Sequence, residues 1–398
     1  MMYYYIIAQP LIDISTAFTV NLPISVGAFI RTMLMLLLLA FMVKQFYQND
    51  KRTLFYLTIA IGTITLTFII NFFLKEPFYL FDEIQFYLKT MYFIVIIFSV
   101  LFVLKTRIFS NKVLRATVWA SMILGVSYWL AILTNTDIKS YAYDKLGYSG
   151  WYFSANELSV IVIILFSLVL SQLHKERSYL TLFSFLLLLS MTPMIGTKTA
   201  FYGGFILLVS YTGYLLVKER RQSTTVVIAL IAVIYIVNLP MTPIYANESY
   251  ERFFERQTNL AEKTDYEQTV LSSRDVYLEE TKEDYKNASW IRKLFGLGYA
   301  GDYKTSPKTI EMDFYDLFFS YGIIGTIIML IPIVKVLEQI WKIHFSFHYV
   351  LLFFSLLLCT GVSFVAGHVM FAPSVMTYFA ILLIAVHIAS EEGVPNQL

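Results

Sequence analysis

Charged residues are scarce in this sequence, and their scarcity excludes an ordinary soluble protein. Only 15% of the 398 residues are charged, whereas a globular domain carries about a quarter. Cysteine is also nearly absent. Cys359 stands alone within an apolar run, which excludes a disulfide framework or a thiolate metal site within one chain. The net charge of +2 gives no reason to expect a nucleic-acid partner.

Long apolar runs recur from one end of the sequence to the other. Hydrophobic residues make up 58% of the chain, and runs such as 54–74 and 201–217 approach the roughly 20 residues that a membrane-spanning helix needs. Runs this continuous exclude the alternating strands of a membrane barrel. We therefore predict an all-α, polytopic integral membrane protein with about 12 transmembrane helices. The predicted spans are 4–20, 24–43, 54–74, 86–104, 114–134, 155–173, 179–195, 199–217, 224–240, 314–334, 348–365 and 371–390.

Lysine and arginine are distributed unevenly between alternate loops. Fourteen of the 30 lie in five short segments, at 44–52, 105–115, 174–177, 218–221 and 335–342. The alternate short connections and their flanks hold only Arg31, Lys75, Lys89, Lys139, Lys145 and Lys198. The positive-inside rule places the first set in the cytoplasm, together with both termini.

One long polar segment interrupts the apolar pattern. Residues 241–312 contain ten basic and thirteen acidic residues, and the alternation places them outside the cytoplasm. Ser272 or Ser273 can cap a helix that runs to about Ala288, followed by a glycine-rich turn at 295–299. We predict nine spans in 1–240, a partly helical extracytoplasmic loop at 241–312, and three spans in 313–398. A second outer segment, 135–153, is rich in Tyr and Trp.

Three basic residues lie at the expected outer membrane boundary, where charges are functional candidates by default. Arg31 could grip phosphate oxygens through its planar fork of donors, or simply reach lipid headgroups. Lys198, on a tight turn between two spans, could bind an anion or anchor the interface. The positive charge of Arg274 at the start of the loop helix is unfavourable to the helix dipole unless a bound anion neutralises it. The alternative to anion binding is a salt bridge to a loop carboxylate such as Glu279.

Acidic residues gather where the loop returns to the membrane. Asp313 and Asp316 share one helical face, and Glu311 precedes them on the turn. Carboxylates this close raise one another's proton affinity, which suits a general base, and they could equally hold a divalent cation. Alternatively, they only complement the helix dipole. His368, on the last outer turn, is a further candidate, although a lone histidine is more often structural.

Six short motifs together resemble the O-antigen ligase and polymerase family. They are Phe153-Ser154-Ala155-Asn156-Glu157-Leu158, Gly196-Thr197-Lys198-Thr199, Ser273-Arg274, Phe295-Gly296-Leu297-Gly298, the acidic run 311–316 and Tyr321-Gly322-Ile323-Ile324-Gly325. The resemblance implies a glycosyltransferase at the outer face of a bacterial plasma membrane. Such an enzyme transfers a polyprenyl-diphosphate-linked glycan to a sugar hydroxyl without a nucleotide sugar.

The resemblance also implies roles for particular residues. The expected site consists of Arg274, Lys198 and Arg31 at the diphosphate, Glu311, Asp313 and Asp316 in catalysis, and His368 and Asn156 at the acceptor or in structure. Ligases of this family often carry His-Asn at the opening of the span after the loop, where this chain has Glu311 and Met312. A carboxylate would then replace the histidine base, which favours a polymerase of capsule, exopolysaccharide or cell-wall repeat units over a ligase.

The expected partners are lipid-linked oligosaccharide, membrane lipids, and a flippase and chain-length regulator of the same pathway. No cofactor is expected, and a divalent cation stays open. A ligase for finished glycan is one alternative function. A transporter or flippase of the same glycans is another, but it would place charges at the bilayer midplane and show related halves. A sensor or structural membrane component is a third.

Overall fold

The computed structural model describes residues 2–22, 24–107, 111–141, 146–176, 178–214, 274–302, 308–341 and 346–392. The predicted ninth span, the candidate helix caps Ser272 and Ser273, and most of the first half of the predicted outer loop lie outside these residues.

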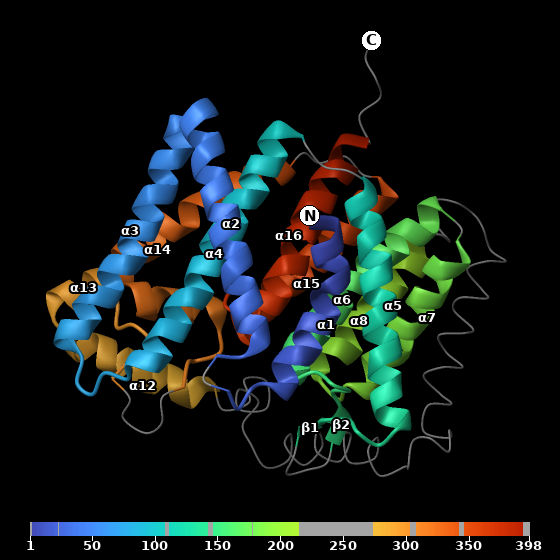
Figure 1. The fold of residues 1–398 in the computed structure, drawn as a ribbon, viewed down its shortest axis with the longest axis horizontal. Helices are drawn as coiled ribbons and strands as arrows, with labels where there is room; N and C mark the ends of the chain where they lie inside the picture. Colours follow the sequence, from blue (N-terminus) through green and yellow to red (C-terminus); the bar gives the residue numbers. More distant parts are fainter. Residues whose placement is uncertain are drawn as a thin grey trace.

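Helices account for most of the described chain (Figure 1). They are α1 (Met2–Phe18), α2 (Val26–Asn49), α3 (Lys51–Leu74), α4 (Leu80–Thr106), α5 (Asn111–Leu133), α6 (Ala155–Lys175), α7 (Tyr179–Met194), α8 (Lys198–Tyr214), α12 (Arg274–Asn287), α13 (Trp290–Phe295), α14 (Asp313–Ile340), α15 (Phe347–Val365) and α16 (Pro373–Glu392). Strands β1 (Lys139–Tyr141) and β2 (Leu146–Tyr148) form one antiparallel hairpin in the aromatic segment 135–153. The predicted all-helical architecture holds apart from this hairpin.

Eight of the described helices are long and apolar enough to cross a membrane, namely α2–α6 and α14–α16. Helices α1, α7 and α8 coincide with three further predicted spans, but they contain only 17, 16 and 17 residues. The structure therefore supports a polytopic membrane protein, and the number 12 stays a prediction.

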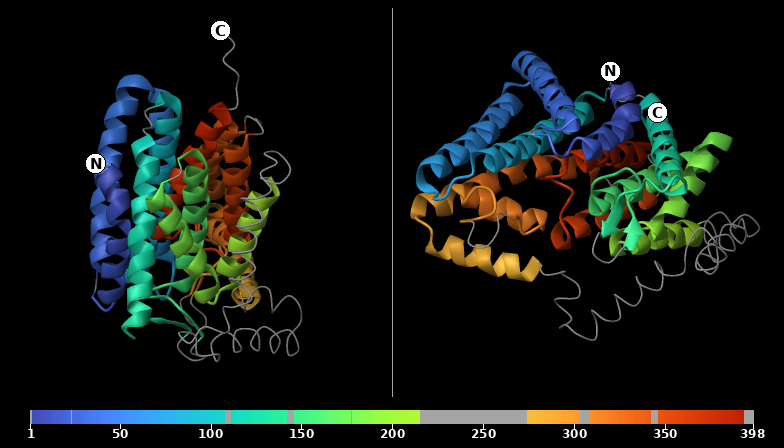
Figure 2. Two further views of the ribbon diagram at one scale, coloured as in Figure 1. Left: turned by 90° about the vertical axis from the view of Figure 1, so that its right-hand side faces the viewer. Right: turned by 60° about the horizontal axis from the view of Figure 1, so that its bottom comes forward.

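Successive spanning helices reverse direction, so their connections gather at two ends of the bundle (Figures 1 and 2). Three exposed ion pairs connect loops that are distant in sequence. They join Lys105 to Asp50 (2.6 Å), Arg107 to Glu391 (3.0 Å) and Arg115 to Glu176 (2.8 Å). Exposed pairs contribute little stability, because water screens them. They show, however, that three of the lysine- and arginine-rich loops share one end with the end of α16. We call this end the basic end.

Helix α6 occupies the middle of the bundle. It packs against α5, α7, α8, α15 and α16, and every residue from Leu158 to Ser171 is buried. A helix that is apolar all round is stable only when other helices surround it. Ser154 caps its first turn by accepting a hydrogen bond from the backbone N–H of Glu157 (3.3 Å). This cap fixes the start of α6 at the end of the bundle opposite the basic end.

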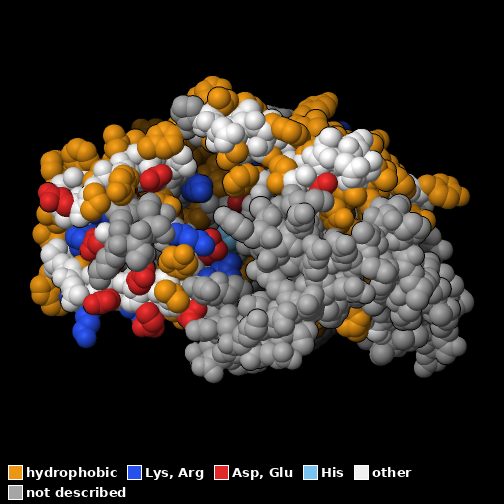
Figure 3. Space-filling model, turned by 90° about the horizontal axis from the view of Figure 1, so that it is seen from below, with side chains coloured by type: hydrophobic (Ala, Val, Ile, Leu, Met, Phe, Trp, Pro, Cys, Tyr) orange, Lys and Arg blue, Asp and Glu red, His pale blue; other side chains and the backbone are white. Residues whose placement is uncertain are grey.

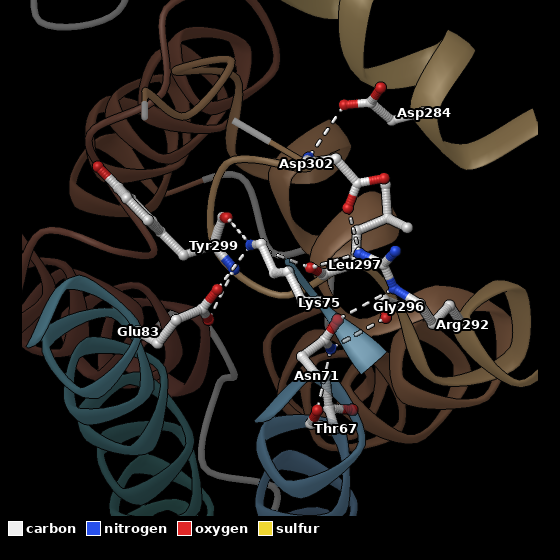
Figure 4. A network of polar contacts seen from close by, with 10 residues as sticks. All are labelled: Thr67, Asn71, Lys75, Glu83, Asp284, Arg292, Gly296, Leu297, Tyr299 and Asp302. Carbon is white, nitrogen blue, oxygen red and sulfur yellow. Dashed lines mark hydrogen bonds and ion pairs between the residues drawn. The ribbon is translucent and has the colours of Figure 1, made fainter. Parts of the chain in front are cut away.

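Helices α12 and α13 form a cap across that opposite end rather than running alongside the spans (Figures 1 and 2). A buried lysine docks the turn after α13 onto α3 and α4 (Figure 4). Nζ of Lys75 pairs with Glu83 (2.6 Å) and donates to the backbone carbonyls of Leu297 (3.3 Å) and Tyr299 (2.5 Å). Lys75 is 2% exposed, so its charge depends on these acceptors.

Arg292 of α13 joins the same network from the cap side (Figure 4). It pairs with Asp302 (2.5 Å), and its Nε donates to the side-chain carbonyl of Asn71 on α3 (3.2 Å). The amide of Asn71 in turn donates to the carbonyl of Gly296 (3.1 Å). Because each buried polar group has a partner on the other element, the cap is fixed to α3 by directional bonds as well as apolar contact.

Two of the glycine motifs are structural partners of each other. At Gly322 the backbone of α14 leaves helical geometry, with φ 64°. The break frees the carbonyls of Phe319 and Ser320, which accept hydrogen bonds from the N–H groups of Leu297 (2.8 Å) and Gly298 (3.1 Å). The turn at 295–298 therefore inserts its backbone into the kink of α14.

Replacing Gly322 with Ala should destabilise the protein by about 2 kcal/mol or more, because the residue sits in left-handed backbone. Its Cβ would also lie 2.6 Å from the backbone of Leu294 and Gly296. Gly361 in α15 is the matched control, since a Cβ there meets nothing within 4 Å. Thermal unfolding followed by fluorescence-detected size exclusion measures both variants. Equal melting temperatures for Gly322→Ala and Gly361→Ala would contradict the packing described here.

Candidate functional site

A cavity of about 220 Å³ lies beneath the cap, and we call it the polar cavity. Its wall includes Lys89 of α4, Glu157 of α6, the acidic residues Glu311, Asp313 and Asp316, and His368 from the turn before α16. Seen from this end, basic and acidic side chains gather around a hollow in the described surface (Figure 3). The structure thus brings four of the predicted site residues, Glu311, Asp313, Asp316 and His368, into one place.

Glu311 is the electrostatic centre of the polar cavity. Its carboxylate lies 3.2 Å from Nη2 of Arg274, 3.3 Å from Nζ of Lys308 and 3.7 Å from Nε2 of His368. Nε of Arg274 also donates to the backbone carbonyl of Glu311 (3.1 Å). Arg274 therefore pairs with Glu311 rather than with Glu279, the partner considered from the sequence.

This charge arrangement shifts the pKa values of two side chains in opposite directions. Burial opposes ionisation of Glu311, but the neighbouring His368, together with Lys308 and Arg274, holds its pKa at about 2. Burial opposes the charge on His368, but Glu311, Glu157 and Asp313 raise its pKa above the ordinary 6.5. Glu311 is consequently a weak base, and His368 is the stronger proton acceptor of the pair.

Nε2 of His368 has two neighbours that suit its two protonation states. The side-chain nitrogen of Asn156, on the first turn of α6, lies 3.4 Å away. A neutral Nε2 accepts a hydrogen bond from this amide, whereas a protonated Nε2 is attracted to the carboxylate of Glu311. The geometry lets the ring gain a proton at this nitrogen without losing a partner.

Both central residues have unusual backbone geometry. Glu311 and His368 lie in the left-handed region, with φ 61° and 64°, which costs a non-glycine residue roughly 1–2 kcal/mol. Their two turns touch. A Cβ on Gly367 would lie 2.6 Å from the carbonyl oxygen of Glu311, so only glycine permits this approach. Such strain persists only where surrounding structure enforces it.

Asp313 and Asp316 provide that enforcement. Oδ2 of Asp313 accepts hydrogen bonds from the backbone N–H groups of Val369 and Met370 (both 3.0 Å), next to His368. The carboxylate of Asp316 accepts from the N–H groups of Ile310 (2.9 Å) and Met312 (3.0 Å), on either side of Glu311. The two aspartates, expected as catalytic, thus hold the two turns that present Glu311 and His368.

The sequence matches the family described as O-antigen ligase like membrane protein over residues 1–269 and 255–391. The chain belongs to this family. A comparison with curated proteins finds no match. Membership confirms the predicted family and indicates a membrane enzyme of polysaccharide assembly with a glycosyl-transfer activity on lipid-linked oligosaccharide.

Two predicted anion-binding residues of this O-antigen ligase-like protein lie elsewhere. Arg31 lines a second cavity of about 440 Å³ between α1, α2, α4 and α6, which we call the apolar cavity, and its guanidinium is paired with the buried Asp13. Lys198 begins α8 after Thr197, which caps that helix and contacts Ser159 (2.5 Å). Lys198 lines neither of the two cavities.

Three residues in or beside the polar cavity were not singled out as site residues from the sequence. Lys89 and Glu157 line the cavity, and the carboxylate of Glu157 accepts a hydrogen bond from Ser374. Lys308 does not line it but pairs with Glu311. Lys89 carried a signal, because it is a charge inside the predicted span 86–104. Glu157 follows Asn156 in a recognised motif. Lys308 carried no signal beyond its position near Glu311.

Metal binding is not supported by the residues that the structure describes. Within them, no three His, Cys, Asp or Glu side chains are grouped so that they could hold an ion. The carboxylates of Asp313 and Asp316 are already engaged with backbone N–H groups. The expectation of no cofactor stays a prediction.

The Glu311–His368 pair should make stability depend on pH. The raised pKa of His368 means that its contribution is full below pH 6.5 and is lost as pH rises through its folded pKa. The lowered pKa of Glu311 keeps its contribution above pH 4.5 and loses it only towards pH 2. The melting-temperature difference between wild type and Glu311→Gln should therefore be larger at about pH 5.5 than at about pH 9.

The same pair of measurements in a His368→Gln background is the control. There the effect of Glu311→Gln should be nearly independent of pH, because only the permanently charged Arg274 and Lys308 remain beside it. A pH-independent difference in the wild-type background would show that the two side chains are not coupled.

Proposed function

We propose that this protein is a glycosyltransferase that polymerises polysaccharide repeat units at the extracytoplasmic face of a bacterial plasma membrane. Its donor is a glycan linked to polyprenyl diphosphate, and its acceptor is a sugar hydroxyl. The observation that carries the proposal is the His368–Glu311 pair, which lines a polar cavity at the end of the bundle opposite the basic end. Family membership supports the reaction class.

The proposed chemistry assigns the proton to His368. Nε2 accepts the proton of the acceptor hydroxyl while the hydroxyl oxygen attacks the anomeric carbon of the donor. The bond between that carbon and the diphosphate oxygen breaks, and the diphosphate leaves with the electron pair. Glu311 faces the same nitrogen at 3.7 Å, so its negative charge stabilises the imidazolium that forms. A carboxylate with a pKa of about 2 suits this supporting role.

Arg274 has a different role in this proposal from the one that the resemblance implied. It contacts the carboxylate and the backbone carbonyl of Glu311, and it does not line the polar cavity. We assign it to positioning Glu311. The side-chain amide of Asn156 donates to Nε2 of His368 when the ring is neutral, so it tunes the same proton acceptor.

A polymerase is favoured over a ligase because Glu311-Met312 replaces the His-Asn of the ligases in the resemblance. A transporter is disfavoured by the placement of charge. The polar cavity, which the acids line, lies beside the cap and next to the connections at one end of the bundle. A carrier for charged glycans would instead need a polar path through the middle of the bundle, where α6 is continuously buried among apolar side chains.

Deleting the gene should cause single repeat units on polyprenyl diphosphate to accumulate on the outer side of the membrane. Mass spectrometry of extracted lipid-linked glycans, with side-selective labelling, measures this. Single units on the inner side would indicate a flippase. Finished polymer that stays on its lipid carrier would indicate a ligase.

In the complemented strain, His368→Ala should lower polymer formation by about 100-fold or more, which is the usual contribution of a general base. Glu311→Gln should lower it by about ten-fold, because the ring remains but loses its charged partner. His174→Ala, at the other end of α6, is the matched control and should leave chain growth unchanged. Full-length polymer from His368→Ala at normal protein abundance would remove His368 from the reaction.

A further inference from the structure

The polar cavity and the apolar cavity share part of their walls. Gln85 and Lys89 of α4 and Glu157 of α6 line both. Gln85 and Lys89 are four residues apart, so they lie on the same face of α4, one turn from each other. The two cavities therefore meet at this face, and we call the place the junction.

The apolar cavity is suited to a hydrocarbon chain. Its wall includes Val20, Leu22, Ile24, Phe29, Phe81 and Leu88. Several of these side chains are also exposed on the outside of the bundle, Ile24 and Phe29 among them. An apolar cavity that continues onto the apolar surface of a membrane protein can receive a lipid chain from the bilayer without desolvating polar groups.

Lys89 differs from the other cations of these walls. Among the described residues it has no ion-pair or hydrogen-bond partner, and its side chain is exposed at the junction. Arg31, by contrast, is buried and neutralised by Asp13. A lysine without a partner, ten residues into a helix that crosses the membrane, is costly unless a ligand or a water-filled space faces it.

We propose that Lys89 binds the diphosphate of a prenyl-diphosphate-linked donor at the junction, with the prenyl chain in the apolar cavity and the glycan in the polar cavity. The assignment rests on the proposed function, and it identifies Lys89 as the cation that binds the leaving diphosphate of that reaction. The departing diphosphate gains negative charge, and a cation at that point stabilises the transition state more than the ground state.

The charges around the junction make such a cation necessary. Asp82, Glu157 and Glu311 line the polar cavity, and they would repel a diphosphate. Glu311 is already balanced by its own cations, and Glu157 is held by Ser374. Lys89 therefore offers an uncommitted positive charge at the place where an apolar chain and a polar glycan would meet.

The test is direct binding of undecaprenyl diphosphate to the purified full-length protein in nanodiscs, measured by native mass spectrometry. Lys89→Met should weaken binding by about ten-fold or more, since it removes a charge-assisted contact, and Lys89→Arg should restore most of it. Lys44→Met is the matched control, because Lys44 is likewise exposed on a spanning helix, near the basic end. It should bind as the wild type does.

Two further ligands separate the possible sources of the phosphate chemistry. Inorganic diphosphate should bind much more weakly than undecaprenyl diphosphate; equal affinity would overturn the placement of the prenyl chain. Phosphatidylglycerol should not compete; equal competition would make the junction a general headgroup site and overturn the proposal.

The outcomes also separate this inference from the proposed function. Undiminished binding to Lys89→Met would remove Lys89 from the donor site and leave the glycosyltransferase proposal standing. A wild-type protein that binds no undecaprenyl diphosphate would overturn both.

Discussion

The candidate site depends on two buried carboxylates that accept hydrogen bonds from backbone. Asp313 and Asp316 lie at the start of α14, and each holds one turn in place. The turns carry Glu311 and His368 in left-handed backbone, a conformation that neither residue would adopt unaided. Each aspartate gains backbone donors that offset its own burial, so strain and desolvation are relieved by the same bonds. Without these hydrogen bonds, nothing described here would hold the Glu311 and His368 side chains facing each other.

A second constraint fixes what lies above the site. The break in α14 at Gly322 exposes two carbonyls, and the turn at 295–298 supplies the N–H groups that they need. The bonds around Lys75 and Arg292 then fasten the same turn to α3. Because α12 and the short α13 lead directly into this turn, docking the turn places the cap helices over the site, where Arg274 pairs with Glu311. The glycine motifs thus affect the site indirectly, because they position the cap that covers it.

The positions of the helices could be predicted from the sequence better than the contacts between side chains. Apolar runs located α14 within one residue of its start, and a serine-initiated pattern located the loop helix that the structure places at 274–287. The clustering of charges at one end followed from the alternation of the loops. The different roles of the acidic residues could not be predicted in this way, because they depend on which backbone N–H groups each carboxylate contacts after folding. The catalytic role expected for Asp313 and Asp316 from the sequence stays a prediction, and their bonds to residues 369–370 and 310–312 show that they hold backbone turns. The β1–β2 hairpin was missed because its aromatic residues equally suit a membrane interface.

The arrangement of charges in the site explains why the cation proposed for the diphosphate is separate from the cations that hold Glu311. Glu311 needs cations to stay ionised beside a histidine, and Arg274 and Lys308 supply them from the cap and the preceding turn. A diphosphate drawn to those same cations would release Glu311 and lower the proton affinity of His368, which would weaken the base when the donor binds. A separate cation on α4 avoids this conflict, because it can hold the leaving group without disturbing the carboxylate–histidine pair. Lys89 lies in the cavity wall on α4, whereas Arg274 lies on α12 and does not line the cavity, which is what such a separation requires.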